Sequence, residues 1–102
     1  MFTGSDEKPV TDKHCLCIHE LVGVSWKKVL RNLSMDDTTI NNLEEDYKHC
    51  EVAEKCYQGL LKWTKIVGPE KATIKKLCYA LRKVGCSKGL EALRNMPHES
   101  NC

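Results

Sequence analysis

Histidine and cysteine gather near the amino end of the sequence, in the six-residue run from His14 to His19. Sulfur and imidazole are ligands that zinc prefers, so this run is the first candidate for a metal site. Its two cysteines, Cys15 and Cys17, lie roughly 200° apart around a helix and would face opposite ways. Structural zinc sites usually separate their cysteines by roughly two to four residues in a knuckle. We therefore expect no bound metal.

The same residue types do not form a recognisable catalytic set. A cysteine nucleophile needs a histidine base, a third group that orients the base, and a cleft. The sequence pattern indicates no such third group for the pair His49-Cys50. No glycine-rich phosphate loop, Ser–His–Asp order or pair of catalytic carboxylates stands out either. We expect a protein that is not an enzyme and that needs no cofactor.

Cysteine usage points to a reducing compartment. The chain has seven cysteines in 102 residues, an odd number, with no Cys-x-x-Cys pair. Cys56 and Cys78 fall inside apolar helical stripes, where a free cysteine behaves as a small hydrophobic residue. A secreted fold held by disulfides would spread its cysteines through loops. Free thiols and a cytoplasmic location are therefore expected.

Length and charge indicate one ordinary globular domain. The net charge of +2 is too balanced to favour nucleic acid or an anionic membrane as partner. No apolar run approaches the ~20 residues of a membrane span, so no membrane insertion and no signal peptide are expected. We expect residues 1–10 to be disordered or a cloning remnant, residues 11–97 to form the domain, and residues 98–102 to be a tail.

The strongest helical pattern runs from Glu51 to Val67. Its apolar stripe is wider than the roughly 100° face of a surface helix, so this helix should lie at the centre of the fold, with Trp63 buried. Gly68, suited to a left-handed C-cap, and Pro69 should end it. The stripe consists of Val52, Cys56, Leu60, Trp63 and Val67, with Ala53, Tyr57 and Leu61 beside it.

Five shorter helices are expected around this one, and no strand. The first should run from Thr11 to Val22, with Leu21 beside its buried stripe, and end at Gly23. Ser25 should cap the second with its hydroxyl. No stretch alternates cleanly enough for a half-buried strand. The second helix is expected at residues 26–33, and the third from a cap at residue 34, 36 or 37 to residue 46. The fifth should run from residue 72 or 73 to residue 84, and the sixth from residue 88 to residue 96.

Charge is segregated among these helices. The second and fifth are basic on their outer sides, and the third is acidic. The simplest interpretation is a solvated surface, since exposed ion pairs contribute only ~0–1 kcal/mol each. Blocks of opposite sign also allow the basic face of one copy to meet the acidic face of another, and such head-to-tail contact can build an open assembly.

Four blocks, in order, resemble the death domain family from about Cys15 to Asn95. The resemblance implies an antiparallel six-helix bundle with Greek-key topology, and homotypic association in place of catalysis. Within the family, the Val-Gly-x-x-Trp motif and the Ala-Thr opening of the fifth helix are most similar to the Fas-associated death-domain adaptors. The blocks are Leu21-Val22-Gly23 with Trp26, Leu30 and Leu33; Asp37 to Tyr47; Leu60 to Trp63; and Lys71 to Ile74 with Leu77, Ala80, Leu81 and Arg82.

The resemblance also implies which residues contact a partner. Arg31 in the second helix and Asp37 at the head of the third occupy positions that the family uses for this purpose. Lys27 and Lys28 flank the first position, and Asp36, Glu44 and Glu45 extend the second. Family members often carry arginine where Lys27 or Lys28 stands, and lysine cannot make the planar bidentate contact to a carboxylate.

The hypothesis that follows is a death-domain adaptor module. It would bind the death domain of a receptor tail or of another adaptor, help to recruit initiator caspases through a separate effector domain, and could form higher-order oligomers. One alternative is the cytoplasmic death domain of a receptor itself. A basic helical nucleic-acid-binding module is an alternative of another class, but the acidic third helix would interrupt the cationic face that it requires.

Overall fold

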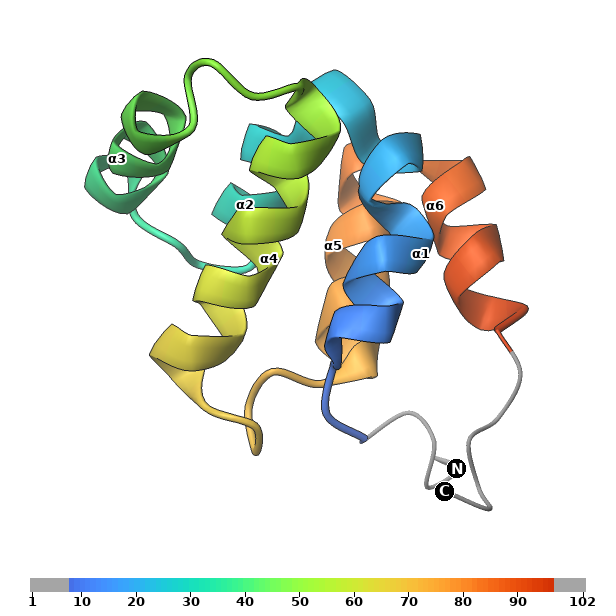
Figure 1. Cartoon of the computed structure of the whole chain (residues 1–102). Helices are drawn as coiled ribbons and strands as arrows, with labels where there is room; N and C mark the ends of the chain where they lie inside the picture. Colours follow the sequence, from blue (N-terminus) through green and yellow to red (C-terminus); the bar gives the residue numbers. More distant parts are fainter. Residues whose placement is uncertain (1–7, 97–102) are drawn as a thin grey trace.

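In the computed structural model, residues 8–96 are described and form six α-helices (Figure 1). Each begins and ends within two residues of its expected position, which confirms the all-α prediction. A short 3₁₀ turn, Gly23–Ser25, joins the first two helices. The α-helices are α1 (Asp12–Val22), α2 (Trp26–Asn32), α3 (Asp37–Asp46), α4 (Val52–Val67), α5 (Ile74–Val84) and α6 (Ser87–Arg94).

Helices distant in sequence pack side by side in this bundle. Helix α1 packs against α4 and α6, α2 packs against α4 and α5, and α3 packs against α2 and α4. Figure 1 shows α3 at one side of the molecule and α6 at the other, with α4 and α1 between them. This is the death-fold bundle that the sequence resemblance implied.

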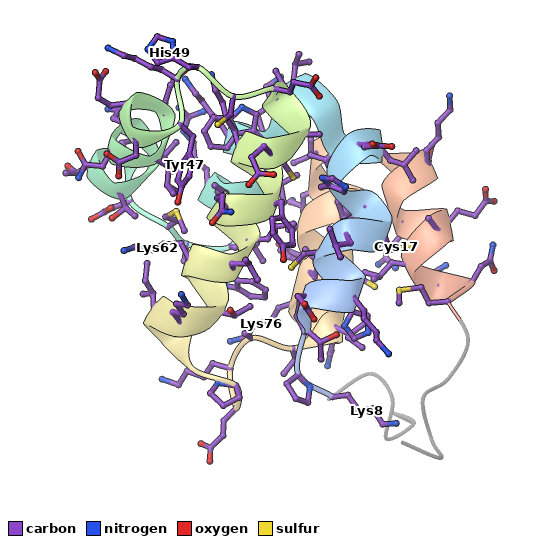
Figure 2. All side chains as sticks on the ribbon, in the orientation of Figure 1. Lys8, Cys17, Tyr47, His49, Lys62 and Lys76 are labelled. Carbon is purple, nitrogen blue, oxygen red and sulfur yellow. The ribbon has the colours of Figure 1, made fainter. Side chains whose placement is uncertain are left out.

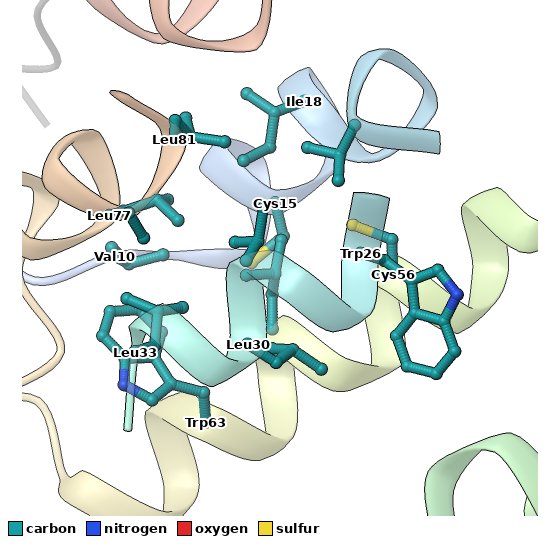
Figure 3. Close-up of a cluster of buried hydrophobic side chains, with 14 of the residues drawn as sticks. Val10, Cys15, Ile18, Trp26, Leu30, Leu33, Cys56, Trp63, Leu77 and Leu81 are labelled. Carbon is teal, nitrogen blue, oxygen red and sulfur yellow. The ribbon is translucent and has the colours of Figure 1, made fainter. Parts of the chain in front are cut away.

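The apolar stripe of α4 lies at the centre of the core. Cys56, Leu60 and Trp63 are buried, and Trp63 is only 2% exposed. Figure 3 shows Trp63, Leu30 and Leu33 within one cluster of buried side chains, in keeping with the packing of α4 on α2. Val52 and Val67, at the two ends of the stripe, are only partly buried. The prediction that α4 anchors the fold through Trp63 is confirmed.

Two helix ends form as expected. The Asp36 carboxylate accepts a hydrogen bond from the backbone N–H of Thr39 at 2.9 Å, so Asp36 is the N-cap of α3. Gly85 ends α5 in the left-handed conformation, at φ 84° and ψ 21°, where the absence of a Cβ removes the steric cost.

Three details of the prediction are wrong. Ser25 makes no capping hydrogen bond with its side chain, because the 3₁₀ turn leads directly into α2. Gly68 has a positive φ of 85°, but its ψ of 161° is extended and not left-handed helical. Leu21 is 42% exposed, because it lies one residue, about 100°, around the helix from buried Val22.

The segment expected to be disordered includes residues that belong to the fold. The backbone N–H of Val10 donates to the carbonyl of Ala72 at 2.7 Å, and the N–H of Ile74 donates to the carbonyl of Lys8 at 3.0 Å. These bonds form an isolated antiparallel bridge between Pro9 and Thr73, and Val10 is buried. Within residues 8–96 this bridge is the nearest approach to a strand. Residues 1–7, and the expected tail with Pro97, lie outside the described residues.

Replacing Trp63 by alanine is expected to lower the free energy of unfolding by roughly 3–5 kcal/mol, the usual cost of deleting a buried large aromatic side chain. Domains of this size hold about 5–15 kcal/mol in total, so the variant should be at least partly unfolded. Thermal melts by far-UV circular dichroism measure the effect. Lys62→Ala, at the exposed preceding position, is the control and should melt like the parent. A Trp63→Ala variant with an unchanged midpoint would contradict the burial of Trp63.

Burial raises the pKa of the Cys15 and Cys56 thiols to about 12, because an apolar surrounding disfavours the thiolate, which is the reactive form. Cys50 is exposed. At pH 8 an alkylating reagent should therefore modify Cys50 in the folded protein, and Cys15 and Cys56 only after denaturant is added. Peptide mass spectrometry after timed labelling gives the rates. Equal rates for all three in the folded protein would exclude this placement of Cys15 and Cys56.

Candidate partner-binding surface

One edge of the outer side of α2 meets the neighbouring helix α3. Lys27 and Arg31 are four residues apart and share one edge of α2. Helix α3 packs beside α2, and its acidic side chains Asp37 and Glu44 meet this edge, as the ion pairs below show. The next residue after Lys27, Lys28, is exposed on a different side of the helix and forms no ion pair within residues 8–96.

Lys27 forms an ion pair with the carboxylate of Glu44, which links α2 to α3. The other Glu44 oxygen, Oε2, lies 3.8 Å from Nζ of Lys55 in α4. The hydrogen bond from Lys27 lowers the pKa of Glu44 below its ordinary value, because it favours the ionised carboxylate. Three helices therefore share one carboxylate at this place.

Arg31 forms the second link between α2 and α3. Its Nε donates to Oδ1 of Asp37 at 3.0 Å. The two side chains are 52% and 74% exposed, so the pair contributes only ~0–1 kcal/mol to stability. Within the described chain the two Nη nitrogens of Arg31 make no hydrogen bond. They can therefore donate to a carboxylate that arrives from outside.

The other predicted contact residues are less closely associated with this pair. Asp36 is occupied as the N-cap of α3, and hydrogen bonds from Thr39 lower the pKa of its carboxyl. Glu45 forms an ion pair with Lys48, at 3.0 Å between Oε2 and Nζ. Of the seven residues expected to contact a partner, the structure thus brings four together across α2 and α3: Lys27, Arg31, Asp37 and Glu44.

Lys55 lies beside these residues but was not among the residues that the sequence predicted to contact a partner. The helical pattern places it on the polar side of α4, but nothing in the linear order shows that this side faces Glu44. Only the packing of α3 on α4 brings the two side chains together. No signal in the linear order distinguishes Lys55 from the other polar residues of α4.

The side chains of the candidate metal run point to separate places. The backbone N–H of Thr11 donates to Nδ1 of His14 at 2.9 Å, and Cys15 points into the core. The Cys17 thiol lies 3.6 Å from the carbonyl of Ala92 in α6, and Nδ1 of His19 lies 3.2 Å from the carbonyl of Ala53 in α4. Figure 2 shows Cys17 on the side of α1 that faces α6. Across residues 8–96, no three ligand-type side chains gather in a way that could hold a metal ion.

No helix within the described range combines the length and the apolarity needed to cross a bilayer.

Comparison with known proteins identifies the family. The death domain family model matches residues 13–96, which span all but the first residue of α1 and the whole of the other helices. A relative is the human receptor-interacting serine/threonine-protein kinase 1, which is 38% identical over 79 residues. These residues are 78% of this chain and only 12% of the kinase, so the chain spans about an eighth of the length of that relative.

The range matched by the family model includes the helices that carry Arg31, Asp37 and their neighbours. Death domains are interaction modules without enzymatic activity, and they bind other death-fold domains. The chain belongs to the death domain family.

Proposed function

We propose that this death domain is an adaptor module of apoptosis signalling, which binds the death domain of a receptor tail or of another adaptor through α2 and α3. Recruitment of initiator caspases would then pass through a separate effector domain. The observation that carries the proposal is the exposed Arg31–Asp37 pair, in which Arg31 uses only Nε within the chain. The adaptor role itself rests on the resemblance of the sequence motifs to those of the Fas-associated adaptors.

The geometry of the Arg31–Asp37 pair leaves both side chains able to bind charged groups of a partner. Asp37 holds the guanidinium group by one edge, so the two Nη nitrogens are oriented before a partner arrives. An arginine fork of this kind matches the two oxygens of a carboxylate. Because less side-chain freedom is lost on binding, the held conformation favours affinity. Asp37 can at the same time accept from a cation of the partner.

The name of the related kinase supports the choice of a receptor tail as partner. Its name describes a protein that interacts with a receptor, which agrees with a receptor tail as partner here. Its kinase activity does not transfer, because the match covers 12% of that protein. A cytoplasmic location is part of the proposal, and the burial of Cys15 and Cys56 as free thiols agrees with a reducing compartment.

Arg31→Glu is expected to leave the fold intact and to abolish binding to a receptor-tail death domain. Reversing a charge at a complementary interface costs several kcal/mol, and about 3 kcal/mol already moves a micromolar contact towards the millimolar range. Binding is measured by isothermal titration calorimetry, with a thermal melt of each variant. Lys65→Glu changes the net charge equally at an exposed position of α4 and should bind like the parent.

A double exchange separates the partner contact from the pair within the chain. Arg31→Glu with Asp37→Lys restores an ion pair of reversed direction between α2 and α3. If Arg31 contacts the partner, this variant should fold and still fail to bind. Recovery of binding in the double variant, or full binding by a folded Arg31→Glu protein, would refute the assignment of Arg31 as a contact residue.

A further inference from the structure

The basic charge of α2 and the basic charge of α5 differ in what surrounds them. On α2, Lys27 and Arg31 are paired with Glu44 and Asp37 of α3. Helix α5 carries Lys75, Lys76, Arg82 and Lys83 and contains no acidic residue. Within the described residues, Lys76, Arg82 and Lys83 form no ion pair. Helix α5 therefore presents three basic side chains that no acidic side chain compensates within residues 8–96.

An exposed aromatic ring lies among these cations. Tyr79 is 53% exposed, and Nζ of Lys83 lies 5.8 Å from the centre of its ring. Lys76, Tyr79 and Lys83 are spaced three and four residues apart, so they follow one another along the same side of α5. Tyrosine is enriched in the central part of protein interfaces. We call Lys76, Tyr79, Arg82 and Lys83 the α5 face.

Uncompensated acidic charge lies elsewhere, where α3 connects to α4. Asp46 ends α3, and Glu51 is the N-cap of α4. Both are exposed and form no ion pair within residues 8–96. Glu54, in the first turn of α4, accepts a hydrogen bond from the Gln58 side chain at 2.7 Å. We call Asp46, Glu51 and Glu54 the acidic corner. The neighbouring Lys48 is occupied by Glu45, and His49 is exposed.

Helix dipoles indicate that two of these charges do not serve stability. The amino end of a helix is stabilised by negative charge and the carboxyl end by positive charge. Lys76 lies in the first turn of α5, which has no acidic residue, and Asp46 lies in the last turn of α3, which has no basic residue. Both charges therefore have the unfavourable sign for their position, so helix stability does not account for them.

One molecule cannot join the two surfaces. Helix α5 packs against α2 and α6, whereas α3 packs against α2 and α4. Figure 2 shows Lys76 towards the lower end of the view and His49, in the connection between α3 and α4, at the upper end. A second copy carries the complementary surface for each.

We propose that the α5 face of one copy binds the acidic corner of a second copy of this chain. Because the two surfaces differ, the contact is head-to-tail, and it leaves one free surface of each kind at the ends of the assembly. It goes beyond the binding of a partner through α2 and α3, since it uses neither Arg31 nor Asp37. Both surfaces can be occupied on the same molecule.

Two charge-reversed variants test the contact. Lys76→Glu with Lys83→Glu makes the α5 face acidic, and Asp46→Lys with Glu51→Ser leaves the corner, which keeps Glu54, with no net charge. A negative charge at position 76 suits the start of α5, a Lys at position 46 suits the end of α3, and a Ser at position 51 is a preferred N-cap. Each protein should therefore fold. Thermal melts check this. Lys62→Glu with Lys65→Glu, at exposed positions of α4, is the control of equal charge.

Sedimentation velocity over a concentration series at low and at moderate salt gives the result. The parent and the control should associate, less strongly at higher salt. Each of these variants alone should associate at least about tenfold more weakly, because like charges meet at the altered α5 face and the altered corner has lost its net negative charge. Mixing the two reversed variants should restore association, since each supplies the surface that the other needs.

Three results would overturn the proposal: a parent that stays monomeric throughout, association that survives Lys76→Glu with Lys83→Glu, or a mixture of folded reversed variants that stays monomeric. Arg31→Glu should self-associate like the parent. Loss of receptor-tail binding and loss of self-association are therefore distinguishable. Binding of the α5 face to anionic lipid vesicles, with no self-association, would assign it to a membrane surface and would also overturn the proposal.

Discussion

The close approach of α2 to α4 is the constraint on which the surface of this domain depends. A Cβ atom added at Gly59, in the middle of α4, would lie 2.6 Å from Cδ1 of Leu30 in α2, which is too close for two carbon atoms. Leu30 is itself buried, so it has little room to move aside. Glycine at this position allows α2 to lie directly on α4, and the orientation of α2 decides where Lys27 and Arg31 emerge.

The position of α2 in turn decides which charges are satisfied within the molecule. With α3 beside α2, Glu44 reaches both Lys27 and Lys55, and Asp37 reaches Arg31. Each exposed pair contributes little to stability, but together they cancel much of the charge that the sequence places on α2 and α3. A count of charge for each helix would therefore overestimate the electrostatic contrast between these two helices. The charges that remain unpaired within residues 8–96 include those of α5 and those at the connection from α3 to α4.

Local patterns predicted most of what depends on local structure, apart from the Ser25 cap and the Gly68 conformation, and failed where distant segments meet. The apolar stripe of α4 and the cap at Asp36 follow from spacing along one helix, and both are present. The bridge of Pro9 to Thr73 is different: it joins segments more than sixty residues apart in the sequence, and a short polar segment gives no sign of it. The pairing of Lys55 with Glu44 could not be predicted either, because the sequence does not show which side of α4 faces α3. The family resemblance implied Arg31 and Asp37 as positions of partner contact, which stays a prediction, but it did not show that the two side chains contact each other.

The two proposed surfaces would contribute differently to assembly. The α2–α3 surface has nearly balanced charge, so its long-range field is weak, and its selectivity depends on the short-range geometry of the Arg31 fork. The α5 face has charge of one sign around an aromatic ring, and such a field acts over about a Debye length, ~8 Å at physiological salt. It would therefore increase the rate of encounter more than it selects a partner. If copies associate through α5 while α2 and α3 stay accessible, several Arg31 forks are displayed together. Individually weak contacts with a clustered receptor tail would then add through effective concentration.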